Sequence, residues 1–390
     1  MFQTGKAFEH IDRLSYEIGP RLAGTRGERM GADYVQQQFN EMGLKPEIHP
    51  FTFVSRWLKR KVAAVVLSAA FLLSLVLSPL VSLILWAIAC ASWFFLDFLL
   101  PRRKSQNIVV RVGDKNAERR VALMAHIDTA PCGKRVHPSV KIIAPLLVII
   151  FLTLLAVRHF YGLSRWEVIW LICGAAIFPL TAMIFNSGRI GKVSPGANDD
   201  AAGVATLLEV ARAWKGILPQ KTEALFIVTG GEEEGLKGAR SLVREGTVPR
   251  DTWILNLDGI GFGSQMYILE GNGIIFPTTT DKEVNKILME AAERAGAKPR
   301  YWWAPLVRHD HIPFAKAGYR ATTMTFDTPS ERPWRYSRLF KLQNARTREY
   351  PHIHQMEDLP EKLDPKTVEL AGAIAIEFLK SAGGIVQAVK

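Results

Sequence analysis

The segment ALFIVTGGEEEGL, residues 224–236, joins a run of apolar residues to three consecutive carboxylates and a glycine turn. A run of acidic residues is usually a solvated helix face, but this one follows a strand-like run. Three carboxylates gathered at a strand end repel one another unless a cation offsets their charge. We therefore predict a buried strand whose end carries one metal ligand and, beside it, a carboxylate able to act as a base.

Short apolar runs of this kind alternate with helical spacing along much of the chain. The runs lie at 107–112, 120–125, 224–228, 252–257, 266–269 and 321–325, and the helical segments at 5–18, 27–43, 200–214, 235–245, 281–295 and 365–381. Such alternation is typical of a sheet covered by helices on both faces. The sequence predicts an α/β fold with a mixed, mostly parallel sheet flanked by helices. Residues 1–55, 101–140 and 187–390 together form this single domain.

Two hydrophobic blocks interrupt the predicted domain. Residues 62–96 contain no charge, and about 35 helical residues would be roughly 52 Å long, against a hydrocarbon core of ~30 Å. Two passes that turn near Pro79 fit this block better than one. The block at 142–185 is split by charged residues near Arg158 and Arg165 and is expected to form a second pair. We predict four transmembrane helices, as hairpins at 56–100 and 141–186; the alternative for the first is a buried hairpin in a soluble core.

The positive charge lies mainly beside these hairpins. The chain carries a net charge of +12, and its flanking residues include Arg56, Lys59, Arg60, Lys61, Arg102, Arg103, Lys104, Lys134, Arg135, Lys141, Arg189 and Lys192. Basic residues favour the cytoplasmic side of a membrane, so both termini and the α/β domain are expected there. The bilayer accounts for the basic excess, and no nucleic-acid partner is expected. A polar opening to Phe53 indicates no cleavable signal peptide, and the three cysteines suit a reducing compartment.

Further metal-ligating side chains occur where other predicted strands meet loops. They are His126 and Asp128 after the run 120–125, Asp199 and Asp200 before the helix 200–214, Asp258 after the run 252–257, and His352 and His354 near the end of the chain. Each alone has an ordinary explanation, since aspartate often caps helices and histidine is common on surfaces. Together they are the ligand types of a hydrolytic site with two metal ions.

At this point the chain resembles a known family. The motifs H-I-D at 126–128, G-A-N-D-D-A-A-G at 196–203, E-E-E-G-L-K-G-A at 232–239, N-L-D at 256–258 and H-Q-M-E-D at 354–358 occur in this order. They resemble the co-catalytic zinc aminopeptidases of metallopeptidase family 28. The segment R-H-D-H-I-P-F at 308–314 is similar to the family's S-D-H segment. The resemblance covers essentially all of the chain outside the hairpins.

The resemblance implies two divalent ions, zinc above all, with cobalt or manganese as alternatives. Carried over by matching position, the ligands of one metal are His126, Asp199 and Asp258, and those of the other are Asp199, Glu233 and His354. Asp199 would bridge the two ions. The family pattern also implies a cis peptide bond between Asp199 and Asp200.

Two further roles follow from the resemblance. Glu232 would take a proton from the attacking water and return it to the leaving amine. Asp128 would orient the His126 ring. The chain departs from the pattern at His309, where the family has serine, and at Ala202; neither is expected to touch a ligand. Asp310, Trp302 and Trp303 are candidate substrate-binding residues, and so is Phe276.

The predicted function is that of a membrane-anchored aminopeptidase that removes N-terminal residues from peptides with a free N-terminus. An amidohydrolase of N-acyl or lipid-linked amino acids, a glutaminyl cyclase and a catalytically silent receptor-like relative are the alternatives. A glutaminyl cyclase would share the fold but have a site with one zinc ion. Retention of the H-x-D motif at His126 argues against a cyclase. The sequence does not indicate an oligomeric state, the side chain preferred in the substrate or the metal used in vivo.

Overall fold

The computed structural model describes residues 2–74, 77–133, 149–150, 153, 156–157, 159–160, 192–274, 276–329, 344–345 and 350–384. The chain divides into two compact units. The first comprises Met1–Thr52, Lys104–Pro131 and Lys192–Lys390, and the second comprises Phe53–Arg103 and Cys132–Gly191. The first unit contains the sheet, and the described part of the second contains two long apolar helices.

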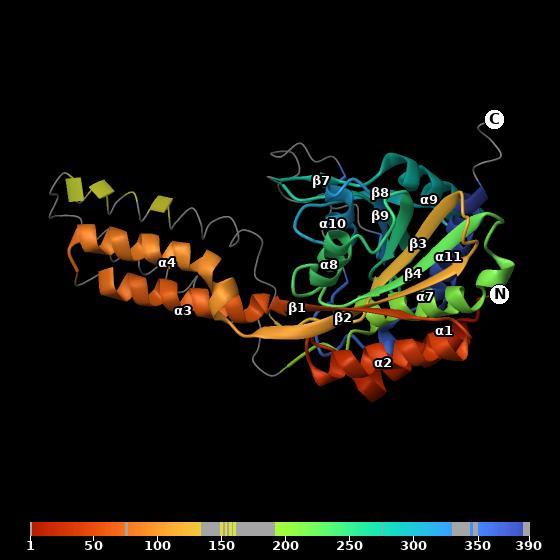
Figure 1. Ribbon diagram of the computed structural model, residues 1–390, viewed down its shortest axis with the longest axis horizontal. Helices are drawn as coiled ribbons and strands as arrows, with labels where there is room; N and C mark the ends of the chain where they lie inside the picture. Colours follow the sequence, from red (N-terminus) through yellow and green to blue (C-terminus); the bar gives the residue numbers. More distant parts are fainter. Residues whose placement is uncertain are drawn as a thin grey trace. The chain divides into compact units, whose positions relative to one another are not determined.

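The sheet of the first unit has nine strands among the described residues, in the order β1-β2-β4-β3-β5-β9-β6-β7, with β8 beside β6. The strands are β1 (Glu47–Val54), β2 (Arg102–Gly113), β3 (Arg119–His126), β4 (Thr222–Thr229), β5 (Thr252–Leu257), β6 (Gln265–Asn272), β7 (Thr278–Thr279), β8 (Arg300–Ala304) and β9 (Arg320–Asp327). The central strands β4, β3, β5 and β9 are parallel, whereas β2 and β6 join them antiparallel. The predicted mixed α/β sheet is confirmed (Figure 1).

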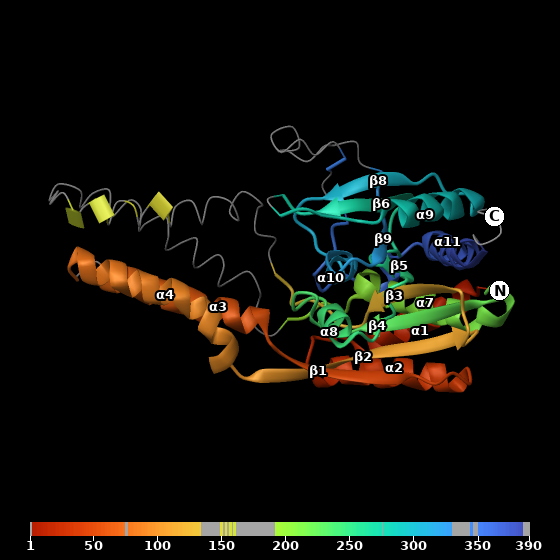
Figure 2. The same ribbon diagram turned by 45° about the horizontal axis from the view of Figure 1, so that its top comes forward.

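Helices cover both faces of this sheet (Figure 2). They are α1 (Thr4–Asp12), α2 (Arg26–Glu41), α7 (Ala202–Arg212), α8 (Lys237–Glu245), α9 (Lys282–Arg294), α10 (His311–Lys316) and α11 (Pro365–Gly384), with π-helical turns η1 (Arg13–Ile18) and η3 (Ala197–Ala201) and 3-10 turns η4 (Trp214–Gly216) and η5 (Pro360–Lys362). Successive strand residues point to opposite faces. In β3, Leu123 packs in the core with α1, α2, α7, α9 and α11, whereas Met124 packs in the core with α8 and α10.

Two elements that the sequence did not predict have local causes. Strand β1 contains Pro50, which removes a backbone donor, and β1 lies at the end of the strand order, where that loss is tolerated. Strand β8 has the sequence RYWWA, too short for its alternation to stand out, and the strand it pairs with is β6. Both strands form because a neighbouring strand of the sheet pairs with them.

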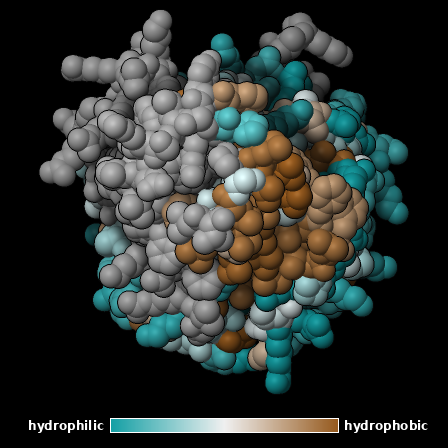
Figure 3. Space-filling model, turned by 90° about the vertical axis from the view of Figure 1, so that its left-hand side faces the viewer, coloured by the Kyte–Doolittle hydropathy of each residue, from teal (hydrophilic) through white to brown (hydrophobic). Residues whose placement is uncertain are grey.

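The second unit contains a helical hairpin made of α3 (Arg56–Ser74) and α4 (Pro79–Leu99). The indole nitrogen of Trp86 donates to Ser74 Oγ at 3.1 Å near the turn, and Lys59 Nζ pairs with Asp97 Oδ2 at 2.6 Å near the open end. Large apolar side chains are exposed on α4, among them Ile84, Ile88, Phe94, Phe95 and Phe98. Figure 3, in which the left-hand side of Figure 1 faces the viewer, shows a broad hydrophobic area among the described residues.

Among the described residues, one helical stretch, Leu80–Leu99, is long and apolar enough to cross a membrane by length and composition. Helix α3 begins with the basic residues Arg56, Lys59, Arg60 and Lys61. Most of the second predicted hairpin, residues 141–186, lies outside the described residues. Four membrane spans therefore remain a prediction.

Replacing Phe378 of α11 by alanine should lower the free energy of unfolding by about 3–5 kcal/mol, because a fully buried aromatic ring leaves a cavity. Urea denaturation followed by circular dichroism would measure the change. Glu369→Ala, at an exposed position of the same helix, is the control and should change stability by no more than about 0.5 kcal/mol. Equal effects of the two substitutions would contradict the assignment of the buried face.

Candidate metal centre

Three neighbouring parallel strands bring the predicted polar residues to one edge of the sheet. His126 is the last residue of β3 and lies opposite Thr229, the last residue of β4. On its other side β3 pairs with β5, which ends one residue before Asp258. Because carboxyl ends of parallel strands meet at one edge, the acidic turn after β4 and Asp258 flank His126.

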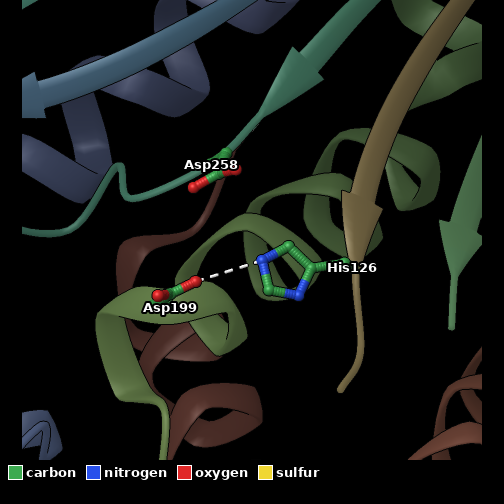
Figure 4. A group of neighbouring side chains, drawn as sticks. All are labelled: His126, Asp199 and Asp258. Carbon is green, nitrogen blue, oxygen red and sulfur yellow. Dashed lines mark hydrogen bonds and ion pairs between the residues drawn. The ribbon is translucent and has the colours of Figure 1, made fainter. Parts of the chain in front are cut away.

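His126, Asp199 and Asp258 form the first group of donors (Figure 4). Each offers one donor atom, and these atoms all lie within 4.8 Å of one another. His126 Nε2 is 3.1 Å from Asp199 Oδ1. All three side chains are buried, and they come from the end of β3, the turn before α7 and the end of β5.

The second group comprises Asp199, Glu233 and His354, whose donor atoms also lie within 4.8 Å of one another. His354 Nε2 is 3.1 Å from Asp199 Oδ2 and 2.8 Å from Glu233 Oε1. The side chain of His354 is 42% exposed, in contrast to the first group, in which no side chain exceeds 6%. Asp199 thus presents one carboxylate oxygen to each histidine and belongs to both groups.

The donor chemistry of both groups fits zinc. Each group offers one imidazole nitrogen and two carboxylates, which are common zinc ligands and also suit cobalt and manganese. Three protein ligands per ion leave positions for water or substrate. The residues present could therefore hold two ions that share Asp199.

The charges of these residues are strongly coupled. Burial alone would raise the pKa of Asp199, but hydrogen bonds with His126 and His354 lower it well below its usual range. The partial burial of His354 would lower its pKa, yet Glu233 and Asp199 raise it to about 10. Glu232 differs from these residues, because burial, together with Glu233 and other nearby carboxylates, raises the pKa of its carboxyl well above the usual value.

The adjacent aspartates before α7 have separate roles. The peptide bond between Asp199 and Asp200 is cis, as the family pattern implied. While Asp199 faces the histidines, Asp200 Oδ1 accepts from Gly203 N at 3.2 Å in the first turn of α7. Asp200 Oδ2 accepts from His126 N at 3.1 Å. Asp200 therefore joins the start of the helix to the end of β3.

Asp128 contacts the turn after β4 as well as His126. Its Oδ1 accepts from Glu232 N at 2.9 Å, and its Oδ2 accepts from Glu233 N at 3.0 Å. His126 Nδ1 lies 3.7 Å from Asp128 Oδ1 and 3.0 Å from the backbone oxygen of Asp128. Asp128 thus contacts the ring with both its backbone and its carboxylate, and the carboxylate also fixes the turn that carries Glu232 and Glu233.

Asp358 makes an equivalent contact with the Asp199 turn. Its Oδ1 accepts from Asn198 N at 2.8 Å and its Oδ2 from Asp199 N at 3.3 Å. The hydroxyl of Tyr350 donates to the same carboxylate at 2.7 Å. The turn that carries Asp199 and the turn that carries Glu233 are therefore each held by a buried carboxylate that accepts two consecutive backbone N–H groups.

The candidate substrate-binding residues lie in different settings. Trp302, in β8, packs in a core cluster with Tyr267 and Leu269, and the Trp303 indole donates to Gly273 O at 2.9 Å. Phe276 is 84% exposed. Asp310 is buried and accepts from the Thr229 hydroxyl, and burial raises the pKa of its carboxyl to about 7.

His309 does touch a predicted ligand, contrary to the expectation for this departure from the family pattern. Its Nδ1 lies 2.6 Å from Asp258 Oδ2, and both side chains are buried. Burial would raise the pKa of Asp258, but His309 lowers it below its usual value. The expectation was wrong because sequence adjacency to Asp310 does not reveal that this loop packs on the end of β5.

Arg21 is a further residue of the site that the sequence did not indicate. It is fully buried, and its guanidinium donates to the carbonyl oxygens of Leu14, Gly19, Ile127, Pro195 and Gly196 at 2.7–3.0 Å. Burial lowers its pKa to about 10, although nearby carboxylates including Asp358 and Asp128 favour the charged form. Arg21 thus places a buried cation near the carboxylates of the site. It also joins the H-I-D segment to the turn that carries Asp199.

With this geometry established, comparison with known proteins identifies the family. Residues 181–379, just over half of the chain, match Peptidase family M28. The chain belongs to this family, which confirms the resemblance.

Individual relatives have low sequence identity to this chain. Aminopeptidase YwaD of Bacillus subtilis is 30% identical over 154 residues, which cover 36% of this chain and 31% of YwaD. A zinc aminopeptidase structure from Bacillus subtilis has a TM-score of 0.59 at 17% identity, covering 97% of this chain and 95% of that one. A glutaminyl cyclase structure from Bacteroides thetaiotaomicron also has a TM-score of 0.59, at 16% identity and with 97% and 98% coverage. These structures share the fold.

Replacing Arg21 by methionine should destabilise the first unit by at least about 3 kcal/mol, because it leaves several buried carbonyl groups without a donor. Chemical denaturation would measure the loss. Arg13→Met is the matched control, since Arg13 is exposed and pairs with Glu17 on the surface, a contact worth about 0–1 kcal/mol. An Arg21 variant as stable as the Arg13 variant would contradict the role given to the buried guanidinium.

Proposed function

We propose that this chain is a membrane-anchored aminopeptidase that uses two divalent metal ions, zinc in the first instance. The observation that carries the proposal is the pair of donor groups that share Asp199, with the buried carboxyl of Glu232 beside them. His126, Asp199 and Asp258 would hold one ion, and Asp199, Glu233 and His354 the other. Family membership supports the reaction class.

The ions would supply the Lewis-acid part of the reaction: when bound, they polarise a peptide carbonyl and acidify water so that it ionises near neutral pH. Glu232 would accept the proton of the attacking water and pass it to the leaving amine. A carboxyl whose pKa is raised by burial is suited to hold that proton between the two steps. Asp128 would keep Glu232 and Glu233 in register by holding their backbone N–H groups.

The acidic surroundings favour a substrate with a free N-terminus. Carboxylates outnumber buried cations at this edge of the sheet, and a substrate ammonium is a charge complement for those that do not bind metal. Asp310 is one candidate for this contact, because its Oδ1 has no hydrogen-bond partner among the described residues. The ammonium bound by Asp310 would belong to the first residue of the substrate, and the leaving amine would belong to the second.

The α3–α4 hairpin supports the membrane part of the proposal. Helix α4 has 21 residues, or about 31 Å, which matches the ~30 Å thickness of a hydrocarbon core. The Lys59 ammonium lies 4.5 Å from the centre of the Trp93 ring at the open end of the hairpin, where basic and aromatic residues suit a membrane interface. We propose four spans with both termini and the α/β unit in the cytoplasm.

A glutaminyl cyclase is the second candidate, favoured by the equally similar cyclase structure. The number of bound metal ions separates the two functions. A cyclase is expected to bind one zinc ion, whereas this chain offers two donor groups. A peptide that begins with glutamine provides the second measurement. The aminopeptidase releases free glutamine from it, whereas the cyclase leaves a peptide blocked at its N-terminus.

Glu232→Gln should reduce kcat by about 100- to 10,000-fold while two zinc ions remain bound, because a base is lost and no ligand. Glu233→Ala should instead leave the protein with one zinc, since the Asp199–His354 group loses a ligand. Hydrolysis of aminoacyl amides and zinc content by mass spectrometry would measure both. A Glu232→Gln enzyme with near-normal kcat would remove Glu232 from the proposed mechanism.

Acetylation of the substrate's N-terminus should abolish cleavage, because it removes the ammonium that the acidic site is proposed to bind. The same peptide with and without the acetyl group, compared by mass spectrometry of the products, is the direct measurement. Faster cleavage of the acetylated peptide would support the alternative amidohydrolase of N-acyl substrates.

The proposed orientation can be tested with single cysteines in a chain whose native cysteines are replaced. Ser164→Cys should react with an impermeant thiol reagent in intact cells, because that loop is placed outside. Lys366→Cys, at an exposed position of α11, should react only after permeabilisation. Labelling in the opposite pattern would invert the orientation. The native Cys132 is unsuitable as a reporter because it is buried.

A further inference from the structure

His309 has one polar contact among the described residues, and that contact is with a proposed metal ligand. Its Nδ1 lies 2.6 Å from Asp258 Oδ2, and its Nε2 has no hydrogen-bond partner there. A ligand carboxylate only accepts hydrogen bonds, so Nδ1 carries the hydrogen and donates it. The ring is therefore directed at Asp258 alone.

The ring of His309 is held on two sides. Trp302 meets it edge to face, with centroids 6.4 Å apart and an interplanar angle of 70°. His311 stacks on it at 6.2 Å and 23°, and His311 Nδ1 is in turn 2.6 Å from Thr323 Oγ1. Thr323 lies in β9, the strand next to β5, so the stack is anchored to the sheet that carries Asp258.

We propose that His309 is a positioning residue that sets how Asp258 binds the metal of the His126–Asp199–Asp258 group. With Oδ2 engaged by His309, Asp258 turns Oδ1 to the ion and binds through one oxygen. A one-oxygen carboxylate keeps the coordination number low, which suits the four-coordinate geometry that zinc prefers over the higher numbers of harder cations. This inference rests on the proposed two-metal function.

The inference also gives Trp302 a role other than a pocket wall. Its ring is buried in the cluster with Tyr267, Leu269 and Ala304, and one edge limits the rotation of His309. A serine at position 309, as in the family pattern, would be too short to make both this ring contact and the bond to Asp258. The His309 imidazole and the indole that packs against it therefore act together on Asp258.

The test is the zinc affinity of each site in the full-length detergent-solubilised protein, by competition with a chelator. His309→Phe keeps an aromatic ring in the stack but removes the donor, and outer hydrogen-bond partners of metal ligands typically contribute 10- to 100-fold in affinity. We expect a loss of about that size for one of the two ions. His309→Asn, whose amide nitrogen can reach the same oxygen, should restore most of the affinity.

His311→Phe is the matched control. It keeps an aromatic ring against His309 and removes an imidazole that bonds to Thr323 rather than to a ligand, so both zinc affinities should stay close to wild type. The absorption spectrum of the cobalt-loaded protein provides a second readout, because a change from one-oxygen to two-oxygen binding alters the cobalt bands. Thermal melting of the metal-free variants checks that each is folded.

The outcomes separate this inference from the proposed function. If the wild type binds two zinc ions and His309→Phe binds both with unchanged affinity, the role of His309 is wrong and the two-metal function stands. If His311→Phe weakens zinc binding as much as His309→Phe does, the stack as a whole matters and the specific bond to Asp258 does not. A wild type that binds fewer than two ions overturns the proposed function and this inference with it.

Discussion

Repulsion among buried carboxylates is the constraint on which the site depends. Asp199, Glu232, Glu233 and Asp258 converge on one sheet edge, where water is too scarce to screen their charges. Asp199 relieves part of this repulsion by standing between two histidines. A pair of divalent cations would relieve the rest, so the same feature that makes the edge unfavourable in isolation suits it to binding metal ions.

The second layer of the site fixes backbone as well as side chains. Asp128 and Asp358 each accept two consecutive backbone N–H groups. Arg21 donates to the carbonyl oxygen of Ile127 and to those of Pro195 and Gly196. These backbone donors and acceptors of the two turns are thereby paired inside the protein. Rigid turns matter here because donor groups must be correctly placed before an ion arrives, and reorganisation on binding would weaken affinity.

The central fold could be predicted from the sequence because it depends on local patterns, whereas the grouping of the donor residues came from the resemblance to a known family. Strands such as β3 and β4 contain continuous apolar runs; His126 is the last residue of β3, and Glu233 lies in the turn after β4. Arg21 and His309 could not be recognised as parts of the site, because their contacts join segments far apart in the chain. Strand β8 was missed for a similar reason, and Trp302 proved to be a core residue supported by that strand.

The apolar hairpin is inserted between β1 and β2, which are neighbours in the sheet. Residues 55–101 thus take the place of the turn that would otherwise link two adjacent strands. Lengthening such a connection from a few residues to this size costs only about 2 kcal/mol of loop-closure free energy, since the cost grows with the logarithm of length. A peptidase fold could therefore acquire a membrane anchor at this point without a change in its core. In evolutionary terms the turn between β1 and β2 is a permissive insertion point, and anchored and unanchored enzymes could share one catalytic sheet.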